Sequence, residues 1–316
     1  MKKIVKIGML VMGLGLAAPG AMADTETIAY PTKSIRLFVP APPGGPTDMA
    51  ARAYARAFEE VSNAKVAVIN QAGGGGVSAF QSVAQGRPDG SVLLFGNSGL
   101  HIAHATGRSP YSIQDYKPVA VLAKLNEAYV VPKNAPYNNL QEFVEYAHAS
   151  EEPITMGIQM GGGSQLKAEA LNKAVDGKLR IVDSGSEGQR IPMILSEQID
   201  ITTFGVVNGL QYERNGDVKV LAVASSAADP AAPNWPTTES AGVDIDLPLI
   251  FNILLPSKSQ DKVTELLDQI HMQLVETDTF KNGMTQVSAI IDYVDSAQAQ
   301  DYLLAEDEIT RALLKK

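Results

Sequence analysis

The feature that most constrains the fold is a repeat of strand, loop and helix near the start of the chain. Short apolar runs at 35–39, 65–69 and 92–95 predict strands, and helical patterns at 47–61 and 77–85 lie between them. Alternation of this kind is typical of βαβ units, which build a parallel sheet covered by helices. The sequence therefore predicts an α/β fold.

The same order of elements returns in the rest of the chain. Further apolar runs predict strands at 129–131, 154–158, 179–182, 199–204, 218–224 and 250–255. Helical patterns cover 139–150, 165–175 and 189–197, and Pro192 restricts the last of these to a first turn or a kink. The tail from Gln260 predicts two or three amphipathic helices. A chain of 316 residues is more typical of two domains than of one.

The composition removes several classes of protein. The chain has no cysteine, which excludes a disulfide scaffold, thiolate zinc sites and iron–sulfur clusters. Its hydrophobic content of 45% indicates a packed core rather than a disordered chain. The formal net charge of −9 argues against nucleic acid as a general partner.

The first residues are typical of a secretory signal peptide. Lys2, Lys3 and Lys6 precede an apolar stretch over 7–18, and Ala21-Met22-Ala23 gives an A-x-A cleavage pattern. A membrane anchor is the alternative, but the apolar stretch is shorter than the roughly 20 residues that a span needs. We expect residues 1–23 to be cleaved before Asp24 during export. Loss of the three lysines takes the net charge from −9 to −12.

Three glycine-rich loops lie where α/β proteins bind their ligands. Each loop follows a predicted strand and precedes a predicted helix, and open α/β sheets bind ligands beyond the carboxyl ends of their strands. Loop one is Pro43-Gly44-Gly45-Pro46-Thr47-Asp48, loop two is Ala72-Gly73-Gly74-Gly75-Gly76, and loop three is Gly161-Gly162-Gly163-Ser164. Glycine admits close approach of the backbone, and free amides at a helix start favour an anion. Three such loops together predict a carboxylate or phosphate site, and plain connecting turns are the alternative.

Two polar residues of loop one have a second interpretation. Thr47 caps the following helix through its hydroxyl or donates to a ligand. Asp48 lies in the first helical turn and stands four residues before Arg52, the spacing of a helix ion pair. The pair is either a surface feature or part of the site.

No residue set predicts catalysis, a metal site or a cofactor. Gly74 to Ala79 fits G-x-G-x-x-A, a dinucleotide fingerprint, but the acid expected about twenty residues on is absent. There is no P-loop and no nucleophile elbow. His101 and His104 share a spacing of three residues, yet no third metal ligand accompanies them, so satisfied or solvated histidines are the expectation. Trp235 is expected to serve packing.

Several short motifs resemble the receptor family of tripartite tricarboxylate transporters, also called the Bug family of periplasmic solute-binding proteins. The resemblance extends over nearly the whole chain after residue 23. The matching pieces are Tyr30-Pro31, Ile35-Arg36, Pro43-Gly44-Gly45 with Asp48 and Ala51-Arg52, Asn70 with Gly73, Gly75 and Gly76, Pro88-Asp89-Gly90, Leu221-Ala222-Val223, and Pro236-Thr237-Thr238-Glu239-Ser240-Ala241-Gly242.

The resemblance implies a two-lobed periplasmic-binding-protein fold of type II, a Venus flytrap, in which each lobe is a mixed, mostly parallel sheet flanked by helices. Lobe 1 is expected to hold 24–124 and 225–316, and lobe 2 to hold 125–224. Loop one would contribute Gly45, Pro46, Thr47 and Asp48, loop two Gly75, Gly76, Val77 and Ser78, and the second lobe Gly163, Ser164 and Asp183. Gly44, Gly74 and Gly162 complete the expected set.

The implied function is capture of a small carboxylate in the periplasm by a monomer and its delivery to a membrane permease. A sensory co-receptor for a membrane signalling protein is the runner-up, and a secreted enzyme is a third class. The sequence does not name the carboxylate.

The chain departs from the family pattern at four positions. Ala41 stands where many relatives have Phe, which predicts a wider pocket, and Ala72 replaces a loop proline. Gln165 stands near a frequent His, and Asp183 near a frequent Tyr. An acid at Asp183 is expected to select an amino or hydroxyl group on the ligand, or to disfavour a second carboxylate.

Overall fold

A computed structural model describes residues 27–314 of the chain. The expected signal peptide over 1–23 lies outside the described residues. Within the described part, no helix combines the length and the apolar character needed to cross a membrane.

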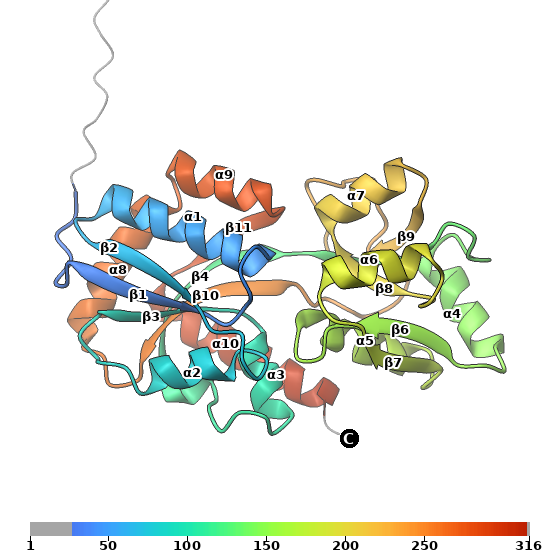
Figure 1. Cartoon of the computed structure of the whole chain (residues 1–316), viewed down its shortest axis with the longest axis horizontal. Coiled ribbons are helices and arrows are strands. Elements are labelled where there is room, and N and C mark those ends of the chain that lie inside the picture. Colours follow the sequence, from blue (N-terminus) through green and yellow to red (C-terminus); the bar gives the residue numbers. More distant parts are fainter. Residues whose placement is uncertain (1–26, 315–316) are drawn as a thin grey trace, which may run out of the picture.

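The first lobe is built on a six-stranded sheet in the order β11-β4-β10-β3-β1-β2 (Figure 1). Its strands are β1 (Ser34–Val39), β2 (Lys65–Asn70), β3 (Val92–Gly96), β4 (Tyr116–Leu125), β10 (Leu249–Pro256) and β11 (Ala289–Val294). The pairs β1/β2 and β1/β3 are parallel, whereas β10 and β11 run antiparallel to their neighbours.

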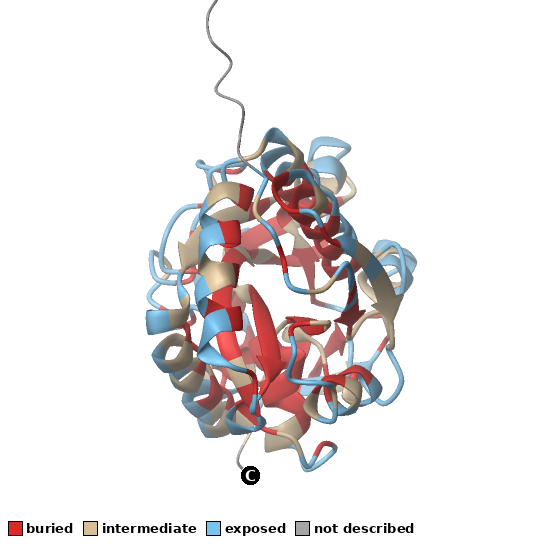
Figure 2. Ribbon diagram, turned by 90° about the vertical axis from the view of Figure 1, so that its left-hand side faces the viewer, coloured by how far each residue is buried: buried red, intermediate tan, exposed pale blue. Residues whose placement is uncertain are grey.

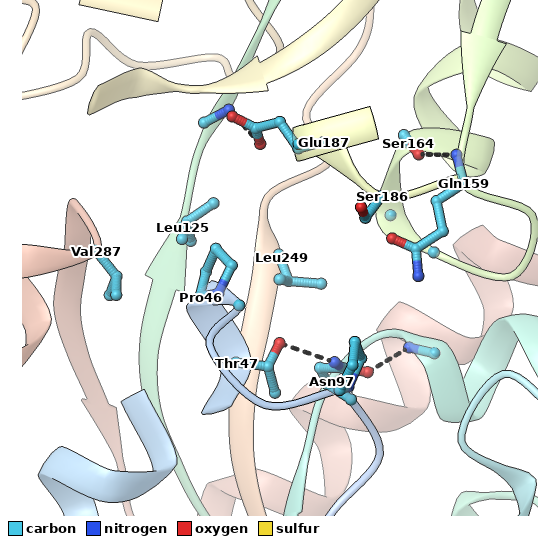
Figure 3. Close-up of a pocket in the computed structure, with 18 of the residues that line it drawn as sticks. Pro46, Thr47, Asn97, Leu125, Gln159, Ser164, Ser186, Glu187, Leu249 and Val287 are labelled. Carbon is cyan, nitrogen blue, oxygen red and sulfur yellow. Dashed lines mark hydrogen bonds between the residues drawn. The ribbon is translucent and has the colours of Figure 1, made fainter. Parts of the chain in front are cut away.

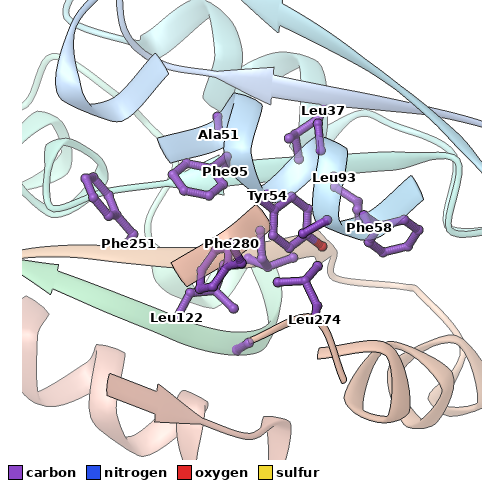
Figure 4. Close-up of a cluster of buried hydrophobic side chains, with 14 of the residues drawn as sticks. Leu37, Ala51, Tyr54, Phe58, Leu93, Phe95, Leu122, Phe251, Leu274 and Phe280 are labelled. Carbon is purple, nitrogen blue, oxygen red and sulfur yellow. The ribbon is translucent and has the colours of Figure 1, made fainter. Parts of the chain in front are cut away.

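Helices cover both faces of this sheet because its strands bury side chains on both sides. Along β1, Ile35, Leu37 and Val39 join one core, and Phe38 joins the other. The first core also holds α1 (Pro46–Val61), α8 (Asp261–Leu274) and α9 (Asp278–Gln286). The second holds α2 (Val77–Ala84), α3 (Gly99–Ala105) and α10 (Ser296–Leu314). Figure 4 shows the first core, with Tyr54 packed among Phe58, Phe95 and neighbouring side chains.

The second lobe repeats this plan on a smaller scale. An antiparallel sheet in the order β8-β5-β9 stands next to the parallel pair β6-β7, and an isolated parallel bridge from Met156 to Ile201 links the two. The strands are β5 (Glu127–Pro132), β6 (Ile154–Ile158), β7 (Leu179–Asp183), β8 (Thr202–Gly205) and β9 (Val218–Val223). One face carries α4 (Leu140–Ala149) and α5 (Gly163–Ala174), and the other carries α6 (Glu187–Leu195) and α7 (Val206–Arg214). Figure 2 shows buried strands inside and exposed helix faces outside.

The mixed α/β architecture is confirmed, but the parallel share was overestimated. Three strand pairs are parallel and five are antiparallel in the described residues. The excess of antiparallel pairs comes mainly from β4 and β5, the strands at which the chain crosses from the first lobe to the second. β4 leaves the first sheet at Leu125, and β5 enters the second at Glu127 after a single intervening residue. Both β4 and β5 run antiparallel to every strand with which they pair, and no helix lies between them.

Of the two predicted boundaries between the lobes, one agrees with the end of a strand and the other does not agree with the observed cores. The boundary at 124/125 falls at the end of β4. By contrast, Val243, Ile245 and Leu247 pack in the core of the second lobe, although 225–316 was expected to belong to the first. Leu313 and Leu314, at the end of α10, also pack against the second-lobe core. Contacts between the lobes therefore extend beyond the crossover strands.

The sequence patterns missed four elements and cut one short. The missed elements are β4, β11, α3 and α7. The helix α6 runs through Pro192, which was expected to restrict it. A capping box at Ser186 and Gln189 starts α6 two residues earlier than predicted, so the proline removes only the partner of the Gly188 carbonyl, and Gly188 is exposed.

Candidate functional site

A cavity of about 620 Å³ opens between the two lobes, within the range of ligand pockets. The helices α1, α3, α5, α6 and α7 begin at its wall, and each of them is the next helix along the chain after a strand. The first turn of a helix leaves backbone N–H groups without intrahelical partners and carries the positive end of the helix dipole. The cavity therefore collects donors from both lobes (Figure 3).

Loop one is shaped by Asp48, whose side chain is only 3% exposed. Its carboxylate accepts from Gly44 N at 2.8 Å, Arg52 Nε at 3.0 Å and Asn70 Nδ2 at 2.9 Å. Burial alone would raise the pKa of Asp48, but these hydrogen bonds and the charge of Arg52 hold it below its usual value. The expected Asp48–Arg52 pair is confirmed, and it fixes the loop rather than facing the cavity.

Thr47 presents a hydroxyl at the cavity wall (Figure 3). Its Oγ1 accepts a hydrogen bond from Asn97 Nδ2 at 3.2 Å, and Asn97 Oδ1 accepts from Gly99 N at 2.9 Å. Because the hydroxyl accepts from Asn97, its own proton is free to donate toward a ligand.

Loop two depends on glycine at consecutive positions. Gly75 and Gly76 have φ of +72° and +96°, a region that other residues rarely adopt. A β-carbon on Gly76 would also lie 2.6 Å from Pro40 Cβ, so loop two packs tightly against the segment between β1 and loop one. Gly75 lines the cavity, whereas Ser78 bonds back to the Gly73 carbonyl at 3.3 Å.

Loop three begins α5, as the sequence predicted. Gly162, Gly163 and Ser164 line the cavity, and Ser164 Oγ accepts from Gln159 N at 2.9 Å. Asp183 lies behind this loop. Its exposed carboxylate accepts from Met160 N at 3.1 Å and from Gly185 N at 3.3 Å, and it is not among the cavity-lining residues. The local geometry gives Asp183 a part in holding the loop.

The predicted residues divide into two groups. Those at the cavity wall are Gly44, Gly45, Pro46, Thr47, Gly75, Gly162, Gly163 and Ser164. Those outside it are Asp48, Gly74, Gly76, Val77, Ser78 and Asp183. Of the departures from the family pattern, Ala41 and Ala72 line the cavity.

The sequence patterns missed the charged residues of the cavity. Among the described residues that line it, the charged side chains are Glu127, Glu187 and Arg190. Glu127 forms a 2.7 Å ion pair with Lys167, whose side chain is 1% exposed. Burial alone would raise the pKa of Glu127, but Lys167 keeps it below its usual value. The missed residues Asn97, Ser186, Glu187 and Asn208 all follow strand ends, the signal that identified the three loops.

Two residues singled out in the sequence, His101 and Trp235, make their contacts within the protein. His101 is buried and lies 3.2 Å from Asp307 through Nδ1, and in residues 27–314 no three acidic or histidine side chains gather to hold a metal ion. Trp235 donates from Nε1 to Glu213 at 2.7 Å, and its ring covers Gly209. His101 is therefore a satisfied histidine, one of the two expected interpretations, and Trp235 serves packing as expected.

Comparison with known proteins agrees with this architecture. The family model described as "Tripartite tricarboxylate transporter family receptor" matches residues 50–315. Protein BugT of Bordetella pertussis is 25% identical over 310 residues, which cover 96% of this chain and 92% of BugT. The match of the family model over most of the chain shows that the protein belongs to the tripartite tricarboxylate transporter receptor family.

Solved structures share the fold. MatC from Rhodopseudomonas palustris, solved with bound malate, superposes with a TM-score of 0.76 at 22% identity, covering 90% of this chain and 100% of MatC. Rpa4515 of R. palustris, solved with adipate, gives 0.78 at 20% identity, covering 90% and 98%.

Proposed function

We propose that this member of the receptor family captures a small organic carboxylate between its lobes in the periplasm and delivers it to the membrane subunits of a tripartite tricarboxylate-type transporter. The observation that carries the proposal is the cavity at whose wall five helices begin. Free amides and helix dipoles converge there, which favours an anion without a free cationic side chain. Arg190, the cation at the wall, is only 2% exposed.

The two-lobed form gives the proposal a mechanism. Loops one and two belong to the first lobe and loop three to the second, and all three line one cavity. A ligand that contacts both lobes stabilises the state in which they stand together, so binding favours closure. Closure then offers the transporter a surface that differs between free and loaded receptor. The malate and adipate held by structural relatives make carboxylates the natural probes.

Binding is tested first by native mass spectrometry of the purified protein, followed by denaturation and identification of what is released. We expect one small carboxylate per chain, recovered chemically unchanged. Turnover of the ligand would instead favour an enzyme, and release of no carboxylate, with none bound from a panel of acids, would contradict the proposal.

The variant Gly163→Val tests whether the carboxylate binds at the start of α5. Gly163→Val adds a side chain at the start of α5, with Lys167 Nζ, Leu249 and Glu127 between 3.4 and 3.6 Å from the new β-carbon. The valine fills the cavity and covers the first amides of the helix, so we expect affinity to fall at least about tenfold in calorimetric titration. Ala297→Val, at an exposed position near the start of α10, is the matched control and should bind normally.

Delivery is tested separately from binding. Uptake of the identified carboxylate should be lost in cells that lack this protein and restored by the wild type but not by Gly163→Val. Normal uptake together with a lost transcriptional response would favour the sensing role over transport.

A further inference from the structure

One anion-binding position of the cavity is already filled by the protein itself. Glu187 is the first residue of α6, and its carboxylate reaches across to the start of α7. There Oε2 accepts from Gly205 N at 3.1 Å, and Oε1 accepts from Asn208 Nδ2 at 2.6 Å. Gly205 is the residue that caps α7, so Glu187 occupies the place that a ligand carboxylate would take at that helix.

The carboxylate of Glu187 differs from the other acid of the cavity in its partners. Glu127 is neutralised by Lys167 at 2.7 Å, whereas in residues 27–314 no basic side chain forms an ion pair with Glu187. Arg190 lies nearby, but its guanidinium donates to Thr202 Oγ1, Gly185 O and Thr203 O at 2.8 to 3.0 Å. The guanidinium of Arg190 therefore donates its hydrogen bonds to residues of its own lobe and not to Glu187.

The surroundings of Glu187 leave its charge only partly compensated. Burial raises the pKa of Glu187, and the charge of Glu127 acts in the same direction, against the hydrogen bonds of Asn208 and Gly205 and the charge of Arg190. A cation brought next to this carboxylate would stabilise its ionised form. A second carboxylate brought there would meet a like charge in a partly desolvated cavity.

The opposite wall has the reverse character. Figure 3 shows Glu187 across the cavity from Pro46, Thr47 and Asn97. That wall consists of glycines, the Thr47 hydroxyl, whose proton is free to donate, and the start of α1. It contributes no charged side chain. It favours an anionic group, whereas the Glu187 wall favours a cationic one.

We propose that Glu187 selects ligands that carry a protonated amine at the end opposite their carboxylate, so that the protein binds aminocarboxylates in preference to dicarboxylates. The proposal rests on carboxylate capture between the lobes as the protein's function and narrows the class of ligand. Each oxygen of Glu187 accepts one hydrogen bond, which leaves lone pairs for the N–H donors of an ammonium group. In this proposal the ligand-selecting role that the sequence suggested for Asp183 belongs instead to Glu187, which lines the cavity.

The test compares ligands of matched length that differ only in the terminal group. The pairs are succinate with 4-aminobutanoate, glutarate with 5-aminopentanoate, and adipate with 6-aminohexanoate. Dissociation constants are measured by calorimetry for the wild type, Glu187→Gln and Glu187→Ala, with thermal unfolding as the check of folding. We expect the wild type to bind the amino acid of the best-bound pair at least about tenfold more tightly than its diacid, and both variants to lose most of this preference.

Two further variants separate the explanations. Glu197→Gln, just beyond the far end of α6 and exposed, should keep the wild-type preference. Asp183→Asn tests the competing selector. Equal binding of both members of every pair by the wild type, or a preference that survives in both Glu187 variants, would overturn the proposal. A preference lost only in Asp183→Asn would reassign the role to that residue. Failure to bind any carboxylate would instead remove the proposed function, and the selection by Glu187 with it.

Discussion

At the scale of single residues, burial gives one histidine of the first lobe an unusual acid–base behaviour. His271 is fully buried in α8, and its Nε2 lies 2.9 Å from the hydroxyl of Tyr54 in α1. The two rings also pack together, with centroids 5.7 Å apart. Burial lowers the pKa of His271 from 6.5 to about 3, because the charged imidazolium would lose its hydration.

Acidification is therefore expected to destabilise the protein through His271. Between its folded pKa of about 3 and its ordinary value of 6.5, the unfolded chain binds a proton that the folded chain does not. The contribution of the neutral imidazole to the free energy of unfolding is fully present above pH 6.5. It is lost progressively as the pH falls from 6.5 through the folded pKa of about 3. From about pH 7 to about pH 5 this group costs about 2 kcal/mol of unfolding free energy.

Urea denaturation at both pH values checks this expectation. His271→Gln keeps a polar partner for Tyr54 but does not titrate, so its stability should change by about 2 kcal/mol less than that of the wild type over this interval. His148→Gln is the control, because the His148 side chain is 44% exposed, and it should follow the wild type. An unchanged pH dependence in His271→Gln would contradict the assignment.

The candidate site shows which residues a sequence can identify. Glycines after strands were predictable, because the turn from strand to helix and the approach of loop two to Pro40 both require them. Glu187 was not. Its role depends on reaching Gly205, eighteen positions along the chain, across the space between two helices. Lys167 and Glu127 are likewise joined only by the fold. Local pattern carries no information on such pairs.

At the scale of elements, loops two and three are held together by a side chain from the turn after α3. A β-carbon on Gly75 would lie 2.5 Å from Arg108 Nη1, and one on Gly161 would lie 2.4 Å from the same atom. The guanidinium therefore packs against a glycine of each lobe, and Arg108 Nε donates to Thr106 Oγ1 at 3.0 Å. Larger residues at either glycine would displace it.

Removal of this contact should favour the open form. In Arg108→Ala the lobes lose a bridge that does not belong to the cavity wall, so we expect a larger radius of gyration without ligand. Affinity for the bound carboxylate should fall between about threefold and tenfold, because ligand must then shift the population toward closure. Small-angle scattering and calorimetry measure the two effects. Arg87→Ala, at an exposed turn, is the control, and equal scattering from both variants would exclude Arg108 as a bridge.

The elements themselves were predicted unevenly. Strands and helices of the βαβ units were recognised because their apolar runs are bounded by glycine and proline. The strand β4 was missed, although all but two of its residues are buried, because it runs almost directly into β5 without a turn to separate them. The helices α3 and α7 were missed because each is short and begins immediately after a strand.

At the scale of the whole molecule, the charge of the chain opposes that of the proposed ligand. The formal net charge is −9, and the cavity wall carries two acids and one largely buried arginine. Long-range electrostatics thus repel an anion, while amides and helix starts attract it only at contact distance. Attraction of this kind is insensitive to dissolved salt, because salt screens buried contacts much less than distant charges.

Salt should therefore speed the capture of a dicarboxylate rather than slow it. Between about 0.01 M and about 0.1 M salt the screening length falls from about 30 Å to about 10 Å, which removes most of the repulsion. We expect the association rate of adipate to rise between about twofold and fivefold, with its dissociation rate nearly constant. The zwitterion 6-aminohexanoate has no net charge and should associate at a rate that salt leaves unchanged. Stopped-flow fluorescence of Trp235, which packs on Gly209 of α7, the helix whose start lines the cavity, follows both reactions. An association rate for adipate that falls with salt would mean that the cavity projects a positive field, contrary to the charges that line it.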